Sequence, residues 1–216
     1  SPIRTFREMD IPVVTAMQND VNGVAWCLVD YLSDLGVKYM TMGSNSHRAD
    51  IPFDRPTLYL WESPSGNSLL SYRPDHYHTA NRWGIDRGDD KGVENGVFSY
   101  ISSLKRRGYD IPLVSVQYSG YSTDNSPPSM LECELIKRWN DHYAWPKLRS
   151  ATIHEFLDRV DGEYAEGLPV YRAAYPDWWT DGFGSAARET AASRTTQSDM
   201  LTISGMFAMA AMSGDD

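Results

Sequence analysis

The chain has 216 residues, of which 41% are hydrophobic and 23% charged, and its formal net charge is −9. This balance is typical of an acidic globular protein that can bury a sizeable core, and it excludes a disordered chain. The negative charge also argues against nucleic acid as a partner, because phosphate backbones would repel it.

The first part of the chain predicts a strand–helix–strand unit. Residues 11–17 are typical of a buried strand, residues 19–23 of a polar turn, and the apolar positions of residues 24–35 recur at helical spacing. Gly36 is suited to ending that helix, and a second strand is predicted over residues 37–42. Two strands joined by a helix through tight connections indicate a parallel sheet.

The middle of the chain adds a hairpin and a further alternation of helices and strands. The strand patterns at residues 57–61 and 69–72 flank residues 64–67, Pro-Ser-Gly-Asn, and we expect this hairpin to be an antiparallel insertion. Thr152 and Glu155 have the spacing of a capping box, which predicts a helix from residue 153. The other predicted elements are a helix over residues 92–107 that stops at Gly108, a strand over 111–117, a helix from 126 to about 143, a short strand over 147–151, and a helix or helix pair from 184 to about 212.

This alternation predicts an α/β fold with helices that flank a mostly parallel sheet. We find no internal repeat, low-complexity tract or linker, so we expect one α/β domain over residues 1–216. Cys27 and Cys133 have no partners at metal-ligand spacing, and neither a disulfide framework nor a zinc finger is predicted.

No membrane span is predicted. The longest apolar run near either end, residues 206–212, has seven residues, far fewer than the ~20 that cross a bilayer. We expect a soluble protein, and its compartment stays open between periplasmic, secreted and other locations of the full-length protein. Both ends resemble cuts within a longer polypeptide, so we expect the remainder of a longer chain as a partner.

Acidic and aromatic residues follow several of the predicted strands. Asp20 follows the first strand, residues 75–78 follow the hairpin, Asp124 follows a later strand, and Asp177 and Asp181 precede the last helix. In α/β folds, ligands bind at the carboxyl ends of the strands. Carboxylates gathered on one face favour glycoside hydrolysis, which needs one carboxylate as nucleophile or base and another as acid.

Each of these positions also has a purely structural interpretation. Asp20 and Asp124 could both be turn residues whose side chains bond nearby backbone. His76 and His78 lie two residues apart, so they share a face of an extended segment and could bind a metal, or they could be solvated in a polar loop.

The densest cluster of such residues lies at positions 176–185. It contains Trp178, Trp179, two aspartates and two glycines. Flat aromatic faces, carboxylates that accept hydrogen bonds, and glycines that let the backbone approach closely suit a sugar ring. The alternative is a helix entrance with Asp181 or Ser185 as N-cap and the tryptophans in the core.

Two segments carry a resemblance to a known enzyme family. Residues 20–23, Asp-Val-Asn-Gly, are followed by Leu28, Leu32, Gly36 to Tyr39, and Met42-Gly43. This run is similar to the nucleophile segment of glycoside hydrolase family 38, the retaining α-mannosidases, in which Asp-Pro-Phe-Gly opens a helix that leads to a strand ending in Gly. Residues 178–186 resemble that family's His-His-Asp-Ala-Ile-Thr-Gly-Thr-Ala motif. The resemblance covers the whole chain and implies a fragment of a (β/α) barrel-like catalytic domain.

The resemblance implies roles for individual residues. It puts Asp20 on the nucleophile, Asp124 on the acid, and Asp181 on the aspartate that grips the sugar hydroxyls. The implied reaction is a double displacement that cleaves a glycosidic bond of an oligosaccharide or glycoconjugate, with the two carboxyl groups ~5 Å apart. Stacking faces and hydrogen bonds for the sugar would come from Tyr77, Trp83, Trp178, Trp179, His76, His78, Asn81 and Arg82.

Two departures from the family pattern bear on its zinc site. The family binds zinc through an early His-x-Asp pair, the nucleophile, here Asp20, and a histidine just before the sugar-gripping aspartate. This chain has no early His-x-Asp, and Thr180 stands at the position of that histidine. The resemblance therefore implies zinc as a cofactor, while Thr180 puts it in doubt, and the chain resembles a divergent relative.

Two other functions stay open. A carbohydrate-binding or catalytically inactive relative would keep Asp181 and the aromatic residues without the zinc chemistry. A metal-dependent deacetylase would use Asp20, His76 and His78 as ligands. Asp20 separates a binder from an enzyme, because a binder has no need of a carboxylate under the anomeric carbon.

Overall fold

The structure, a computed structural model, describes residues 2–43, 45, 57–122 and 125–214. Contacts divide the chain into two compact units, residues 1–176 and residues 177–216, and each is described by itself. A single domain over the whole chain stays a prediction. Within the described ranges, none of the helices combines the length and the apolar character needed to cross a membrane.

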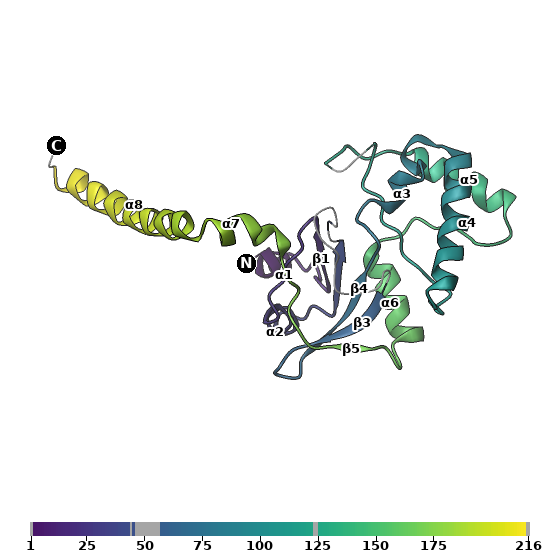
Figure 1. Cartoon of the computed structure of the whole chain (residues 1–216), viewed down its shortest axis with the longest axis horizontal. Helices are drawn as coiled ribbons and strands as arrows, with labels where there is room; N and C mark the ends of the chain where they lie inside the picture. Colours follow the sequence, from purple (N-terminus) through teal and green to yellow (C-terminus); the bar gives the residue numbers. More distant parts are fainter. Residues whose placement is uncertain (1, 44, 46–56, 123–124, 215–216) are drawn as a thin grey trace. The chain divides into compact units, whose positions relative to one another are not determined.

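The first unit alternates helices and strands (Figure 1). Its elements in chain order are α1 (Pro2–Glu8), β1 (Thr15–Asn19), α2 (Leu28–Asp34), β2 (Tyr39–Gly43), β3 (Thr57–Glu62), β4 (Ser68–Arg73), α3 (Thr79–Arg82), the 3-10 helix η1 (Ile85–Arg87), α4 (Asp90–Arg106), α5 (Leu131–His142), α6 (Ile153–Tyr164) and β5 (Val170–Tyr171).

One mixed sheet connects the strands in the order β1-β2-β4-β3-β5. Strands β1, β2 and β4 run parallel to one another, β3 runs antiparallel to β4, and β5 runs parallel to β3. The predicted α/β fold with a mostly parallel sheet and a hairpin is therefore confirmed. The hairpin is built into the sheet, because its strand β4 lies directly beside β2.

Both faces of the sheet are covered, and the strand residues alternate between them. Tyr59 and Trp61 of β3 join a core cluster that includes Val29 of α2. Leu58, which precedes Tyr59, faces a second cluster, which includes Leu157 of α6. Each such side chain stabilises the fold by roughly 1.5–3 kcal/mol when fully buried, so the two helices fix the sheet from opposite sides.

A third cluster lies among the helices that follow the hairpin. Val93 and Val97 of α4 pack with Leu135 and Trp139 of α5, and Ile85 of η1 joins them. These helices form the group at the right of Figure 1. Elements η1 and α4 lie between β4 and the segment around residue 120, and α5 follows that segment.

Several predicted elements form close to the expected positions. Helix α4 ends just before Gly108, whose φ is +72°. Helix α6 has the predicted capping box, in which the Thr152 backbone N donates to Glu155 Oε2 at 2.8 Å and Glu155 N donates to Thr152 Oγ1 at 3.3 Å. The first strand lies at Thr15–Asn19, and α2 begins only at Leu28, because Val24 pairs with Tyr175 in an isolated bridge.

Two predicted strands do not form, over residues 111–117 and 147–151. Carbonyl groups of the first segment accept hydrogen bonds from side chains instead of from a strand, since Tyr72 Oη donates to Ser115 O at 2.6 Å. In the second segment, both backbone groups of Leu148 bond the Asn140 amide. The helix predicted from residue 126 begins at Leu131.

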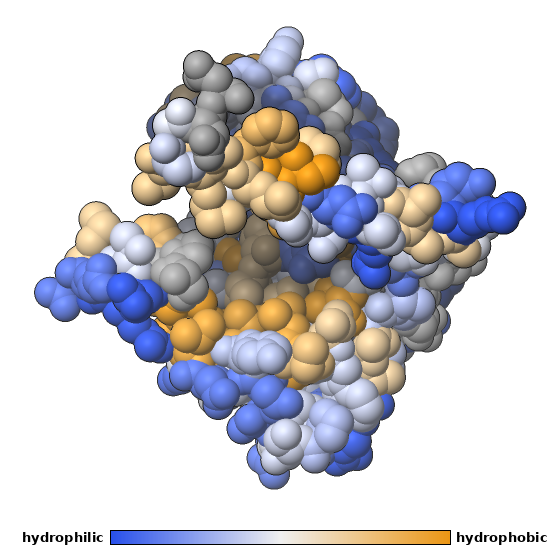
Figure 2. All heavy atoms as spheres, turned by 90° about the vertical axis from the view of Figure 1, so that its left-hand side faces the viewer, coloured by the Kyte–Doolittle hydropathy of each residue, from blue (hydrophilic) through white to orange (hydrophobic). Residues whose placement is uncertain are grey.

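The second unit is helical, as predicted. It contains the 3-10 helix η2 (Trp178–Thr180), α7 (Asp181–Ser185) and α8 (Ala187–Ser213). The N-cap of η2 is Asp177, and neither Asp181 nor Ser185 caps a helix by its side chain. Large hydrophobic side chains of α8 are exposed. Figure 2 shows hydrophobic and hydrophilic patches side by side at the molecular surface.

Candidate active site at the strand ends

Three chain segments meet at one edge of the sheet. Since β1, β2 and β4 are parallel neighbours, their carboxyl ends lie together. Asp20 follows β1, Gly43 ends β2, and residues 76–78 follow β4. The sequence therefore brings two of the predicted site segments to the same place.

Asp20 is half-buried and fixed by two hydrogen bonds. Its backbone N donates to Gly43 O at 2.8 Å, and Asn45 Nδ2 donates to its Oδ1 at 2.8 Å. Its φ of +56° places it in the left-handed region, which aspartate tolerates better than most residues. Asp20 is thus a turn residue, and its carboxylate is also oriented by a partner from beyond β2.

Gly43 is the point at which the segments around Asp20 and Tyr77 touch. A Cβ added to Gly43 would lie 2.6 Å from Tyr77 Cβ and 3.2 Å from Tyr77 Cα, and it would also collide with Asn19 Oδ1. Only glycine allows this approach, because real Cβ atoms keep larger distances. The absence of a side chain at Gly43 therefore lets the post-β4 segment lie against the turn that carries Asp20.

The histidine pair follows β4 as a packed aromatic group. His76 is 7% exposed and Tyr77 5%, and the ring centroids of His76 and His78 lie 4.2 Å apart. The backbone N of His78 donates to His76 Nδ1 at 3.3 Å, so a neutral His76 carries its proton on Nε2. A fully solvated polar loop, one of the two interpretations of this pair, is wrong for His76.

A fourth segment, residues 117–122, lies beside the same group. Ser119 Oγ donates to Tyr77 O at 3.5 Å, and Ala80 N donates to Gln117 O at 3.0 Å. Asp124, the predicted acid, lies outside the described residues. Asn81 was expected to bond sugar hydroxyls, but it is 4% exposed and its amide bonds the backbone of this segment.

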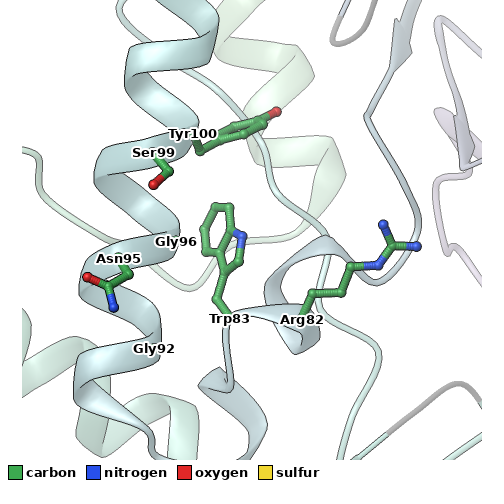
Figure 3. Close-up of a pocket in the computed structure, with 7 residues that line it drawn as sticks. All are labelled: Arg82, Trp83, Gly92, Asn95, Gly96, Ser99 and Tyr100. Carbon is green, nitrogen blue, oxygen red and sulfur yellow. The ribbon is translucent and has the colours of Figure 1, made fainter.

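Trp83 lies beside helix α4, in an open hollow of about 470 Å³ (Figure 3). A Cβ added to Gly96 would lie 2.6 Å from Trp83 Cδ1, so the indole packs directly on the helix backbone there. Asn95 and Ser99 also line the hollow, whereas the Arg82 side chain extends away from the indole. A sugar-stacking role for Trp83 stays a prediction.

Asp75, the first residue of the predicted 75–78 group, interacts with Tyr100 of α4 and with Arg107, which follows α4. Its Oδ1 lies 3.3 Å from Arg107 Nη1. Burial raises the pKa of Tyr100 strongly, and the neighbouring Asp75 carboxylate raises it further. Tyr100 therefore stays a neutral phenol, and Asp75 anchors the chain after β4 to the helical layer.

The predicted sugar-binding cluster lies in the second unit. Trp178 and Trp179 are half-buried, and Asp177 Oδ1 accepts a hydrogen bond from Trp179 N at 2.9 Å. Asp181 is exposed, and its Oδ1 accepts from Gly182 N at 2.7 Å. Thr180 Oγ1 donates to Asp177 O at 2.7 Å, so its hydroxyl serves the local turn.

The described side chains do not by themselves make up a metal centre. Among the residues that the structure describes, no three His, Cys, Asp or Glu side chains gather as metal ligands. Asp20, His76 and His78, the ligand set of a deacetylase, thus form no such group. Zinc at Asp20 stays a prediction.

The α/β unit thus has a mostly parallel sheet with a carboxylate, that of Asp20, at the end of its first strand. The family model of the glycosyl hydrolases family 38 N-terminal domain matches residues 4–174. The chain belongs to this family.

A solved structure has the same fold. It is the crystal structure of an alpha-mannosidase from Enterococcus faecalis V583, with a TM-score of 0.53 and 13% sequence identity over 82% of this chain. The chain spans 19% of that protein. No curated protein sequence matches this chain.

Proposed function

We propose that this chain is part of a retaining glycoside hydrolase that cleaves α-mannosides in an oligosaccharide or glycoconjugate. The observation that carries the proposal is Asp20, which follows β1 with its carboxylate held by Asn45, at the strand ends where Gly43 lies close to Tyr77. A nucleophile needs an accessible carboxylate in a fixed orientation. Membership of family 38 supports hydrolysis of glycosides, and the alpha-mannosidase with the same fold suggests the sugar.

In the proposed reaction Asp20 attacks the anomeric carbon, and the bond from this carbon to the leaving oxygen breaks. Asp124 gives its proton to that oxygen. Asp124, now a carboxylate, then takes a proton from water, the water oxygen attacks the anomeric carbon, and the Asp20 ester is broken. Both carboxyl groups return to their starting states, and the two inversions give overall retention.

Sugar-binding roles are proposed for side chains within each unit. Asp181 would accept hydrogen bonds from sugar hydroxyls, and Trp178, Trp179 and Trp83 would offer stacking faces. His76 and His78 would donate or accept hydrogen bonds beside Asp20, which their packing against Tyr77 favours.

We also propose a zinc ion that Asp20 would bind. Asp20 would hold the zinc, which would supply Lewis-acid stabilisation to the bound sugar. The metal content of the purified full-length protein, before and after chelation, tests this independently of activity. About one zinc per chain that Asp20→Asn removes would support it, and no zinc in an active protein would contradict it.

A second candidate is a carbohydrate-binding relative without catalysis. It is favoured by Thr180, because a threonine hydroxyl is a poor zinc ligand and this one is already engaged by Asp177 O. Such a protein would bind mannosides with the same affinity after Asp20→Asn.

Release of aryl leaving groups from α- and β-glycosides by the full-length protein tests the two candidates. We expect hydrolysis of α-mannosides that Asp20→Asn lowers roughly a thousand-fold or more. Asp10→Asn is the matched control, because Asp10 also has a φ of +56° but lies ahead of β1. A folded protein that binds mannosides and hydrolyses no glycoside would be the binding relative.

A further inference from the structure

The hollow beside Trp83 is built from other residues than the site at the strand ends (Figure 3). Arg82 and Trp83 at the end of α3 form one side of it, and one face of α4 between Gly92 and Tyr100 forms the other. At about 470 Å³, the hollow falls within the range of small-molecule sites, roughly 300–1,000 Å³. It is therefore large enough for a small ligand of its own.

The indole of Trp83 lies with its face against α4. A Cβ added to Gly96 would collide with Trp83 Cγ, and it would lie 2.6 Å from Cδ1 and 2.7 Å from Cδ2, the two ring atoms that flank Cγ. Within the ring plane the position next to Cγ is taken by the Cβ of Trp83 itself, so Gly96 lies over the ring. Trp83 is half-buried, and its remaining surface lines the hollow.

Tyr100 fixes the indole from a second side. The two ring centroids lie 5.4 Å apart, with their planes at 55°. The Asp75 carboxylate holds Tyr100 by a hydrogen bond, and Asp75 is itself paired with Arg107. The aromatic surface of the hollow is thus already ordered, which lowers the entropic cost of binding a ligand.

The polar side chains of the hollow are neutral. Asn95 and Ser99 are exposed and line it, and residues four apart are neighbours on a helix surface. An amide and a hydroxyl both donate and accept hydrogen bonds. Arg82, the charged residue of the lining, extends its side chain away from the indole (Figure 3). This lining favours a neutral ligand with hydroxyl groups over an ion.

We propose that the hollow is a second carbohydrate-binding site, in which a sugar ring stacks on Trp83 and bonds Asn95 and Ser99. A sugar ring carries C–H groups on its faces and hydroxyls at its rim, so an aromatic face flanked by an amide and a hydroxyl matches both. The site goes beyond the proposed function, because binding there needs no bond cleavage and uses none of the residues at the strand ends.

Fluorine NMR of the full-length protein labelled with 5-fluorotryptophan tests the site at Trp83 itself. Its resonance is the one that Trp83→Phe or Trp83→Tyr removes, since either variant keeps a ring against Gly96. The probe is thio-linked α-mannobiose, whose sulfur link resists hydrolysis. We expect it to shift this resonance saturably, and mannitol, which has the hydroxyls but no ring, to leave it in place. No shift with the disaccharide, or an equal shift with mannitol, would overturn the site.

Variants of α4 test the polar part of the site. The double variant Asn95→Ala/Ser99→Ala removes both hydrogen-bonding side chains, so we expect it to raise the Kd read from the Trp83 resonance at least about fivefold. Ser102→Ala is the matched control, because Ser102 is exposed on the same helix but does not line the hollow. An unchanged Kd in the double variant, or an equal rise in Ser102→Ala, would overturn the roles of Asn95 and Ser99.

The site and the proposed function fail separately. A saturable shift of Trp83 in a protein that hydrolyses no glycoside would support the second site and contradict the hydrolase. Hydrolysis of α-mannosides without any shift of Trp83 would support the hydrolase and overturn the second site.

Discussion

Asp20 owes its orientation to a backbone conformation that few residues adopt. A φ of +56° one residue beyond β1 turns the chain sharply out of the sheet, at a cost of roughly 1 kcal/mol for a residue with a side chain. The Asp20 N to Gly43 O hydrogen bond and the Asn45 contact offset that cost. Such strain is common at functional positions, which agrees with the role proposed for this carboxylate.

Gly43 gives a prediction at the residue scale. Gly43→Ala should lower activity at least about tenfold, because the new Cβ would lie 2.6 Å from Tyr77 Cβ and would displace the Asp20 turn or the histidine group. Steady-state kinetics on an α-mannoside would measure this effect. Gly162→Ala is the control, since a Cβ added there meets nothing within 4 Å. Full activity of the Gly43 variant would contradict the close packing described for the site.

Part of the site could be predicted from single residues, and part could not. The place of Asp20 in a turn after β1 was predictable, because Asp-Val-Asn-Gly closely follows an apolar strand pattern. The role of Asn81 was not, because its partners Ser119 and Gly120 lie far along the chain and only tertiary structure brings them together. A surface hydrogen-bonding role was the natural expectation for an asparagine next to histidines, and burial excludes it.

At the scale of elements, α6 depends on its N-terminal capping box. Thr152→Ala should lower the free energy of unfolding by about 1 kcal/mol, because it leaves the Glu155 N–H without its side-chain acceptor. Urea unfolding followed by circular dichroism would measure the change. Ser102→Ala is a suitable control, since Ser102 Oγ only donates back to Phe98 O within α4. Equal losses in the two variants would mean that the cap has no special role.

Helix α2 is tied to the hairpin through Asp30. Its carboxylate accepts hydrogen bonds from Ser63 Oγ at 2.6 Å and Asn67 Nδ2 at 2.9 Å. These bonds lower the pKa of Asp30 below its ordinary value of 3.8, and the bond from Ser63 has the largest effect. The stabilisation is therefore complete above the unfolded pKa and is lost as the pH falls through the lower folded pKa.

Unfolding titrations between neutral pH and pH 3 should show this linkage. Asp30→Asn removes the titrating group, so its stability should fall less steeply below about pH 4 than that of the unaltered chain. Asp34→Asn removes the same charge from the same helix without altering these bonds, and it should keep the steeper fall. Parallel curves for all three proteins would contradict the assignment to Asp30.

The elements that a few adjacent residues define were predictable. The strands that depend on hydrogen bonds from another strand were not. The capping box, the helix that stops at Gly108 and the hairpin turn are read from a few adjacent residues, and all three form. Residues 111–117 have an equally apolar sequence but remain outside the sheet, because side chains such as Tyr72 take their carbonyl groups. A strand exists only where another strand accepts its hydrogen bonds.

At the scale of the whole molecule, the sequence belongs to the family 38 N-terminal domain and spans 19% of an alpha-mannosidase with the same fold. The composition and the β–α–β alternation predicted the class of fold, and the motif that begins at Asp20 lies within the residues that the family model matches. The motif at residues 178–186 lies in the second unit, beyond residue 174, where the match to the family model ends. The proposed function therefore has to be tested with the full-length protein.

The most direct test of the proposed function is to trap the covalent intermediate. The full-length protein would be incubated with an activated fluoro-α-mannoside, whose fluorine slows hydrolysis of the glycosyl ester, and its peptides would be analysed by mass spectrometry. We predict one mannosyl adduct, on the peptide that contains Asp20, and none in Asp20→Asn. An adduct on another carboxylate, or turnover with inversion and no adduct, would contradict Asp20 as the nucleophile.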